Sequence, residues 1–369
     1  MIKIKQENQE GAIYKFGSGL SLFFIGLAII LFLILLFPTF FPEKYDYTKL
    51  SSLGSTATGF ISPIVAISAA MLTFLAFWVQ YKANEQQKND ITIQRFENIF
   101  FEMIRLHKEN VNEMKISGYG VLLGNSLERE KGVLTKSTES KIQTERFVEG
   151  RKVFVSMIKE LTACYGFCQE YKSLTNDTEL LKIGYRLFFF GSVSSSITPN
   201  EKDSDIISKM RIKLKKIRDD HKKELGLKTT FKDIQGDIDL HIKYAPFTGH
   251  ESRLAHYYRH LFNTVKYVVD KEKKGIFDYQ QSREYLKILR AQMSNDEQLM
   301  LYYNYINGMG SKWEDEENKF FSHYRMLHNL PINRVRFVEN PRLHFKKQIE
   351  EIELETNGSE QMFESDDKI

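Results

Sequence analysis

Three histidines and two arginines fall within one twelve-residue stretch, GHESRLAHYYRH, at residues 249–260. If this stretch is helical, Arg253, His256 and His260 lie on one face, because residues three, four and seven positions apart return to the same side of a helix. Such a face could bind a metal ion, cleave RNA, or only pack against another part of the chain. Each of these interpretations makes a different demand on the surrounding sequence.

Zinc binding requires further ligands at fixed spacings. His256 and His260 stand four residues apart, so two imidazoles on one helix could share a zinc ion. In the helical pattern HExxH, however, Glu251 would follow the ligand His250, and Leu254 occupies the position of the second histidine. No third ligand stands nearby in the sequence, so we expect no metal ion and no other cofactor.

Metal-free cleavage of RNA requires a cation and a proton-transferring group. Arg253, six intervening residues and His260 match the permissive arginine-to-histidine spacing of HEPN-type ribonucleases, which are all-helical. In such a site the arginine would stabilise phosphate charge and the histidine would transfer a proton. The same spacing arises by chance in helical proteins. Arg253 and His260 are therefore an alternative catalytic pair, and a polar network that packs or meets a partner is the preferred interpretation.

Two uncharged apolar runs, at residues 20–37 and 59–79, define the class of protein. Each is close to the ~20 residues that a helix needs to cross ~30 Å of hydrocarbon. A signal peptide is the competing interpretation of the first run, but no small-residue cleavage site follows it and a second run comes soon after. We therefore expect a two-helix transmembrane hairpin.

Positive charge flanks this pair of runs. Three lysines precede the first run, and Lys82, Lys88 and Arg95 follow the second, whereas the two lysines between the runs are offset by Glu43 and Asp46. Because positively charged flanks stay in the cytoplasm, this distribution predicts a two-pass protein with both termini cytoplasmic.

Small residues form a stripe along the second apolar run. The six members are Gly59, Ser62, Ala66, Ala69, Thr73 and Ala76. Their spacing of three and four places them on one helical face, where small side chains let two helices approach closely in lipid. The stripe could contact the first run within the hairpin, or it could join copies of the chain into a homo-oligomer. Both interpretations can hold together.

The overall composition excludes little. Of the 369 residues, 52 are basic and 48 acidic, giving a formal net charge of +4, which does not by itself favour nucleic acid as a partner. The only two cysteines, Cys164 and Cys168, stand one helical turn apart. Two cysteines make neither a disulfide framework nor a complete zinc site, so we expect two buried thiols on a helix.

A helical period dominates the chain after the second run, and alternating strands bounded by hairpin turns are scarce. We therefore expect an all-α protein, in which a transmembrane hairpin precedes a mostly helical cytosolic domain. The expected divisions are a cytosolic N-terminal segment at 1–17, the hairpin at 18–80, the helical domain at 81–345 and an acidic tail at 346–369. Helices are expected within the domain at 95–114, 145–171 and 178–190.

Three segments depart from this helical pattern. Residues 117–144 are rich in Gly, Ser, Lys and Glu and predict a loop or a poorly ordered connection. The strongly charged residues 198–243 predict a solvated helix face, with acidic lipid or nucleic acid as the alternative contact. From about Glu355 the tail is acidic and aperiodic, which predicts disorder.

Local signals add detail to the expected helices. His107 and Asn110 fall inside the apolar stripe of the helix at 95–114, so they must find hydrogen-bond partners, because a buried unpaired group costs ~1–3 kcal/mol. Ser294 and Glu297 have the spacing of a capping box and predict the start of a helix. Gly308 is placed to end that helix in a left-handed conformation.

Four blocks after the two apolar runs carry a resemblance to a known family. The blocks are RFENIFFEMIRLHKENVNEM, GHESRLAHYYRHLFNTVKYV, YLKILRAQMSNDEQLMLYYNYINGMG and FFSHYRMLHNL. In this order they resemble the phage abortive infection family typified by AbiC, from the second run to about Phe345. The resemblance implies bacterial antiphage defence, and it assigns no catalytic residue. Together with the two apolar runs, it leads us to expect a protein of the bacterial inner membrane. The matching polar residues mark a candidate shared site: His107, Asn110, Arg253, His256, His260, Arg290, Gln292 and Asn304.

Two functions are compatible with these observations. In the first, the helical domain senses infection or a companion defence protein, and the apolar helices associate in inner-membrane lipid and permeabilise the membrane. In the alternative, those helices only tether a HEPN-like ribonuclease that uses Arg253 and His260 and takes RNA as its partner. A phage-derived trigger would fit either function.

Overall fold

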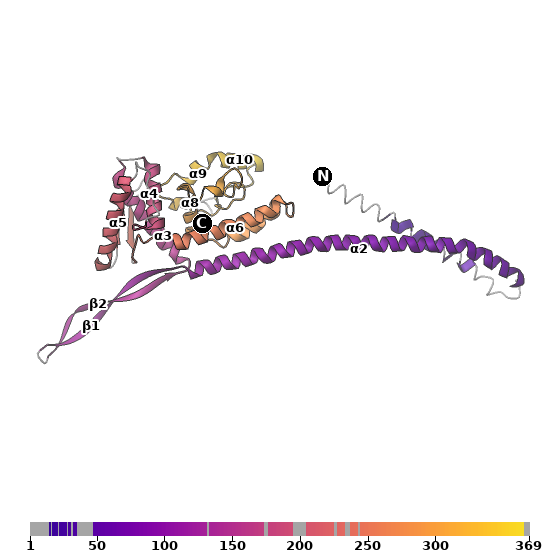
Figure 1. The fold of residues 1–369 in the computed structure, drawn as a ribbon, viewed down its shortest axis with the longest axis horizontal. Helices are drawn as coiled ribbons and strands as arrows, with labels where there is room; N and C mark the ends of the chain where they lie inside the picture. The colour runs from indigo at the N-terminus through magenta and orange to yellow at the C-terminus, as the bar shows by residue number, and fades with distance from the viewer. Residues whose placement is uncertain are drawn as a thin grey trace. The chain divides into compact units, whose positions relative to one another are not determined.

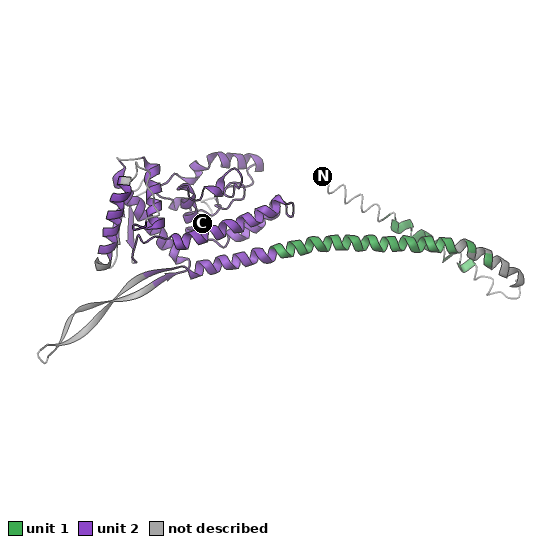
Figure 2. Ribbon diagram, in the orientation of Figure 1, with its two compact units in different colours: residues 1–96 green, residues 97–369 purple. Residues whose placement is uncertain are grey.

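The computed structural model describes residues 15, 17–20, 22–27, 29–30, 32–34, 47–130, 133–172, 176–194, 204–224, 227–232, 237–242 and 244–364. The chain divides into two compact units, residues 1–96 and 97–369 (Figure 2). Helices make up most of the described residues, and the few strands form two separate two-stranded sheets. The expected mostly helical class is therefore confirmed.

Unit 1 contains two apolar helices. The first is Gly17–Ile34, with a mean hydropathy of 2.5. The second is the apolar part of α2 (Tyr47–Glu113), where the best window of Ser62–Glu113 has a mean hydropathy of 1.9. None of the first window and 6% of the second is buried inside the protein. Both helices are long and apolar enough to cross a membrane.

One face of α2 meets the N-terminal helix in the described part of this unit. A groove is lined by Ser18, Leu22 and Ile25 on one side and by Leu72, Leu75, Ala76, Val79 and Gln80 on the other. On α2 the partly covered side chains recur at helical spacing: Ile64, Ser68, Met71, Leu75 and Trp78. The hairpin contact is therefore centred on this apolar face.

The stripe of small residues is exposed. Gly59, Ser62, Ala66, Ala69, Thr73 and Ala76 are all solvent-accessible, and of these six Ala76 lines the groove. Each member of the stripe from Ser62 onward stands two residues from a member of the covered face. Because each residue rotates the helix by about 100°, two residues correspond to about 200°, which is nearly the opposite side. Most of the stripe consequently points away from the N-terminal helix where both are described.

Unit 2 holds the last turns of α2 and all the following elements (Figure 1). In chain order they are β1 (Lys115–Glu130), β2 (Val133–Glu149), α3 (Lys152–Cys168), η2 (Gln169–Tyr171), α4 (Asp177–Phe190), α5 (Ser204–Glu224), β3 (Leu227–Phe231), β4 (Ile238–Ile242), α6 (Glu251–Lys273), α7 (Tyr279–Arg290), α8 (Asn295–Ile306), η3 (Ser311–Glu314), η4 (Ile332–Arg334), α9 (Pro341–His344) and α10 (Lys346–Thr356).

Helix α3 forms the centre of the core. It packs against α4 and α8, and almost all of its side chains from Glu160 onward are buried. Cys164 and Cys168 are both free and fully buried there, as expected from their spacing. Burial raises the pKa of the Cys168 thiol to about 12, so this thiol stays protonated at neutral pH.

A long hairpin replaces the loop expected at residues 117–144. Strands β1 and β2 pair antiparallel from Lys115 opposite Glu149 to Glu130 opposite Val133, with a register shift between Gly124 and Ser126. Pairing of backbone groups needs no alternation of apolar residues, so the polar composition concealed these strands. The helix expected from residue 145 therefore begins later, at α3, after Gly150 with φ of 62°.

Other elements lie close to their expected places. The helices predicted at 95–114 and 178–190 correspond to the end of α2 and to α4. The Ser294–Glu297 capping box starts α8, and Gly308, with φ of 84°, follows its end. The acidic tail differs from the expected disorder: α10 continues to Thr356, and Met362 and Phe363 are buried against the domain.

A close approach of two backbone segments fixes the start of α6. Gly249 has φ of 92°, and a Cβ atom placed there would lie 2.6 Å from the carbonyl oxygen of Phe190. Gly191, with φ of 87°, meets the carbonyl oxygen of Thr248 at the same distance. The N–H of His250 then donates to Phe189 O at 2.8 Å. Only glycine can occupy both positions without moving the backbone.

A buried pair lies beneath this crossing. His250 Nε2 is 3.2 Å from Glu160 Oε2, and both side chains are inaccessible to solvent. Glu160 Oε1 also accepts the N–H of Phe247 at 2.8 Å. The opening residues of GHESRLAHYYRH, Gly249 and His250, therefore anchor α6 to α3.

Replacing Gly249 with alanine should destabilise unit 2 severely. The left-handed φ costs ~1–2 kcal/mol for an alanine, and the clash with Phe190 O adds to it. Gly275→Ala is the matched control, because Gly275 also has positive φ (71°) but nothing within 4 Å of its Cβ position. Urea unfolding of both variants measures the difference. Equal losses in the free energy of unfolding would show that the close approach to Phe190 O adds nothing to the cost of a side chain at Gly249.

Candidate functional site

Helix α6 presents two faces, as its sequence predicted. The buried apolar face consists of Leu254, Tyr257, Tyr258, Leu261, Val265, Val268 and Val269, together with Thr264. On the polar face, His256 is exposed, whereas Arg253 and His260 are half-buried. The polar face is thus partly covered by other elements of unit 2.

The last turns of α2 bring a second histidine to α6. The His107 ring lies 6.1 Å from the His260 ring and 5.3 Å from the Tyr257 ring, centre to centre. His107 is only 2% exposed. Two imidazoles and a phenol from helices far apart in sequence therefore meet at one point.

A small cavity opens beside these rings. Its volume is about 200 Å³, and it is lined by His107, Lys108, Val111, Asn112, Arg151 and Gln292. The guanidinium of Arg151, just before α3, donates to Gln292 O at 2.6 Å. The cavity is large enough for several water molecules or one small polar group.

Several polar atoms of this cluster lack hydrogen-bond partners among the described residues. They are His107 Nε2, Tyr257 Oη, His260 Nδ1 and Glu297 Oε1. Glu297 belongs to the cluster electrostatically, because its charge acts on Tyr257 and that of Arg151 acts on Glu297. Each buried unpaired group costs ~1–3 kcal/mol. The site therefore has hydrogen-bonding capacity that a polar ligand or water can satisfy.

Burial sets the protonation of the cluster. It lowers the pKa of His107 to about 4, with further lowering by His260 and Arg151. Burial and the neighbouring His256 also lower the pKa of His260. Both imidazoles are consequently neutral at pH 7 and can accept a proton or donate a hydrogen bond. Burial raises the pKa of Tyr257 well above its usual value, so its hydroxyl stays protonated.

The eight polar residues expected to share one site occupy different places. His107 and Gln292 line the cavity, and the His260 ring lies 6.1 Å from that of His107 without lining it. The exposed His256 acts electrostatically on His260. Asn110 is half-buried one turn beyond His107 and is not among the lining residues.

The other three residues lie outside the cavity. Arg253 Nε donates to Lys115 O at 2.9 Å and ties α6 to the start of β1. Asn304 is buried in the core, where its amide donates to Tyr185 Oη at 2.9 Å. Arg290 lines a separate cavity beside α7. The sequence blocks thus combine residues with different structural roles.

Three members of the cluster were not expected from the sequence. Arg151 lies outside the four sequence blocks, the sequence pattern did not single out Tyr257, and Glu297 was assigned only to the capping box. Nothing local marks Arg151, because its role depends on the packing of α3 against α8. Glu297 could have been suspected, since a carboxylate inside an apolar block needs a polar neighbour.

Comparison with known proteins supports a defence role. Residues 249–335 match the family described as "Putative phage abortive infection protein". No curated protein and no solved structure matches the chain. The matched residues run from the backbone crossing at Gly249 through α6, α7 and α8 to η4. The expected resemblance is therefore confirmed for this region, and it supports antiphage defence in general.

Two adjacent tyrosines, one with a hydrogen-bonded hydroxyl and one without, allow a test of the assignment of unpaired groups. Tyr258 Oη donates to Met300 O at 3.1 Å, whereas Tyr257 Oη has no partner among the described residues. Tyr258→Phe should therefore lower the free energy of unfolding by ~1 kcal/mol, and Tyr257→Phe should leave it unchanged or raise it. Loss of phage protection by a fully stable Tyr257→Phe variant would assign the hydroxyl a functional role. Equal destabilisation by both changes would contradict the assignment of Tyr257 as unpaired.

Proposed function

We propose that this chain is an abortive-infection effector of the bacterial inner membrane. Its helical domain senses infection, through a phage-derived trigger or a companion defence protein, and its two apolar helices then permeabilise the membrane. The chain crosses the membrane twice with both termini in the cytoplasm, and copies associate through α2. The observation that carries this proposal is the exposed stripe of small residues on α2.

The stripe is suited to contact with a second copy of α2. The covered face of α2 includes Ile64, Ser68 and Met71, and the stripe lies on the opposite, exposed side, where another helix could contact it. In lipid, helices associate through close packing, and small residues permit it. Large apolar side chains beside the stripe, including Phe74 at 64% and Phe77 at 67% exposure, are suited to lipid tails. Such an arrangement supports assembly within the membrane.

Assembly of this kind must be restrained before infection, because a permanently open membrane would kill the host cell. A trigger can move the equilibrium only by binding the active arrangement better than the resting one. Moving the population from about 1:99 to 99:1 requires ~5.5 kcal/mol of differential binding. The helical domain is the part of the chain that could bind such a trigger, and it contains the family match.

The ribonuclease alternative has one observation in its favour. His107 lies beside His260, and His107 and Arg151 both line the small cavity, a set of groups suited to contact with phosphate. Two observations weigh against it. Arg253 already donates to a backbone carbonyl, and the lowered pKa values of both histidines leave neither protonated at pH 7. A proton-donating acid for the leaving group is therefore missing from the proposed pair.

The stripe is tested by enlarging its residues. Ala66→Leu and Ala69→Leu should abolish assembly and phage protection, because the longer side chains prevent close approach of two helices. Val65→Leu is the matched control, since Val65 is 48% exposed but lies beside the stripe. Crosslinking in membranes measures assembly, and plaque counts measure protection. If all three variants assemble and protect like the wild type, the stripe is not a contact surface.

The function itself is tested by measuring membrane permeability and RNA integrity in the same cells after infection. Cells with the intact chain should admit propidium iodide or lose membrane potential, and cells with a chain lacking residues 1–80 should not, although the fragment accumulates. Full protection by the fragment would exclude permeabilisation. RNA fragments that appear with the wild type, but not with a well-folded His260→Ala variant, would establish the ribonuclease instead.

A further inference from the structure

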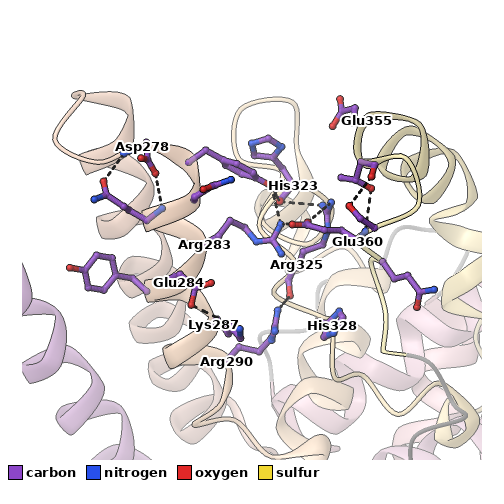
Figure 3. Close-up of a pocket in the computed structure, with 17 residues that line it drawn as sticks. Asp278, Arg283, Glu284, Lys287, Arg290, His323, Arg325, His328, Glu355 and Glu360 are labelled. Atoms are coloured by element: carbon purple, nitrogen blue, oxygen red, sulfur yellow. Dashed lines mark hydrogen bonds and ion pairs between the residues drawn. The ribbon is translucent and has the colours of Figure 1, made fainter. Parts of the chain in front are cut away.

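A large cavity lies on unit 2 beside α7, and its lining residues differ from those of the small cavity at His107. It has a volume of about 990 Å³. Helix α7, the segment before η4 and the residues after α10 form its walls (Figure 3). Six lining residues carry the argument: Arg283, Arg290, His323, Arg325, His328 and Glu360. The full lining combines three arginines and Lys287 with four carboxylates, those of Asp278, Glu284, Glu355 and Glu360.

One carboxylate serves two of these arginines. Glu360 Oε2 accepts from Arg283 Nη1 at 2.8 Å and lies 3.6 Å from Arg325 Nη2. The Arg325 side chain is 3% exposed, and its Nε has no hydrogen-bond partner among the described residues. Its backbone has φ of 59°, a left-handed conformation that costs ~1–3 kcal/mol for a residue other than glycine. A strained, buried arginine is thus held in the cavity wall.

The positive charge of Arg290 has even fewer compensating partners than the charges of Arg283 and Arg325. Its Nη1 donates to Arg325 O at 2.8 Å, and it forms no ion pair among the described residues. Burial lowers the pKa of Arg290 to about 10, and the charges of Arg283 and Arg325 lower it further against the raising effect of Glu364 and Glu284. Because no carboxylate among the described residues pairs with this guanidinium, an anion placed beside it would be stabilised.

The other acidic groups of the cavity do not neutralise it. Glu284 is exposed and pairs with Lys287 at 4.0 Å, and Glu355 and Asp278 are also exposed, so solvent screens all three. The Asp278 carboxylate also accepts the N–H of Gln281 as the cap of α7. Burial lowers the pKa of His323 and of His328, which keeps both imidazoles neutral at pH 7. Glu360 is itself 45% exposed and belongs to the segment after α10. It is an internal counterion that a stronger anion can displace.

We propose that this cavity binds a small phosphate-bearing ligand of nucleotide size, with its phosphate oxygens held by Arg283 and Arg290. The buried charge of Arg325, whose Nη1 donates to Ser322 O and His323 O, adds to the attraction. Planar guanidinium groups match phosphate oxygens in paired hydrogen bonds. The volume agrees with the ~300–1,000 Å³ of small-molecule sites. The half-buried ring of Tyr279 also lines the cavity, with Arg283 over it at 5.7 Å and the His323 ring 4.5 Å away, centre to centre. This ligand site does not depend on the membrane function proposed above.

Binding of two phosphate probes to the full chain in detergent micelles tests the site. ATP and inorganic pyrophosphate, each without divalent cations, should bind in calorimetric titrations. Arg290→Gln should weaken binding about tenfold or more, because it removes charge-assisted hydrogen bonds to phosphate. Glu360→Gln should strengthen binding, because it removes the competing carboxylate. Arg105→Gln is the control, since Arg105 pairs with Glu102 and Glu109 outside the cavity.

Thermal melting confirms that each variant is folded, and Arg283→Gln replaces Arg290→Gln if the latter is not. If ATP binds but pyrophosphate does not, and the arginine variant no longer binds ATP, the site is supported and the base contributes to affinity. Absence of binding by both probes overturns the proposal. So does binding that the arginine variant leaves unchanged.

Discussion

The backbone crossing at Gly191 and Gly249 is the constraint on which unit 2 depends. Each glycine faces the carbonyl of the other segment at a distance that no side chain tolerates, and His250 closes the contact by donating to Phe189 and meeting Glu160. This contact fixes where α6 begins relative to α3 and α4. Since α6 is rigid over 23 residues, its start also determines where His260, two and a half turns later, meets His107.

Features encoded within one helix were predictable from the sequence. The two faces of α6, the Ser294 capping box and the burial of Cys164 follow from the helical period and from local hydrogen bonds. Features that depend on contacts between distant segments were not. The β1–β2 hairpin has no alternating pattern to mark it, and Arg151 joins the cavity only because α3 packs beside the start of α8.

The candidate residues illustrate how sequence blocks and sites differ. Asn304 and Arg290 stand in the same block, yet one donates a hydrogen bond in the core and the other lines an arginine-rich cavity. A helix has several faces, and neighbours in sequence point to different ones. Grouping residues by block therefore predicts which segment matters but not which side chains act together. To know which side chains act together, one needs the packing of α6, α7 and α8.

The His107 cluster also bears on how a restraint on the membrane helices could be released. His107 stands on α2, the same continuous helix that carries the stripe of small residues. Four polar atoms around it have unmet hydrogen bonds, each worth ~1–3 kcal/mol if a ligand or a rearranged contact satisfies it. Together they are comparable with the ~5.5 kcal/mol that a complete population shift requires. Under the proposed function, a trigger that bound at this cluster would act directly on α2, because His107 belongs to that helix.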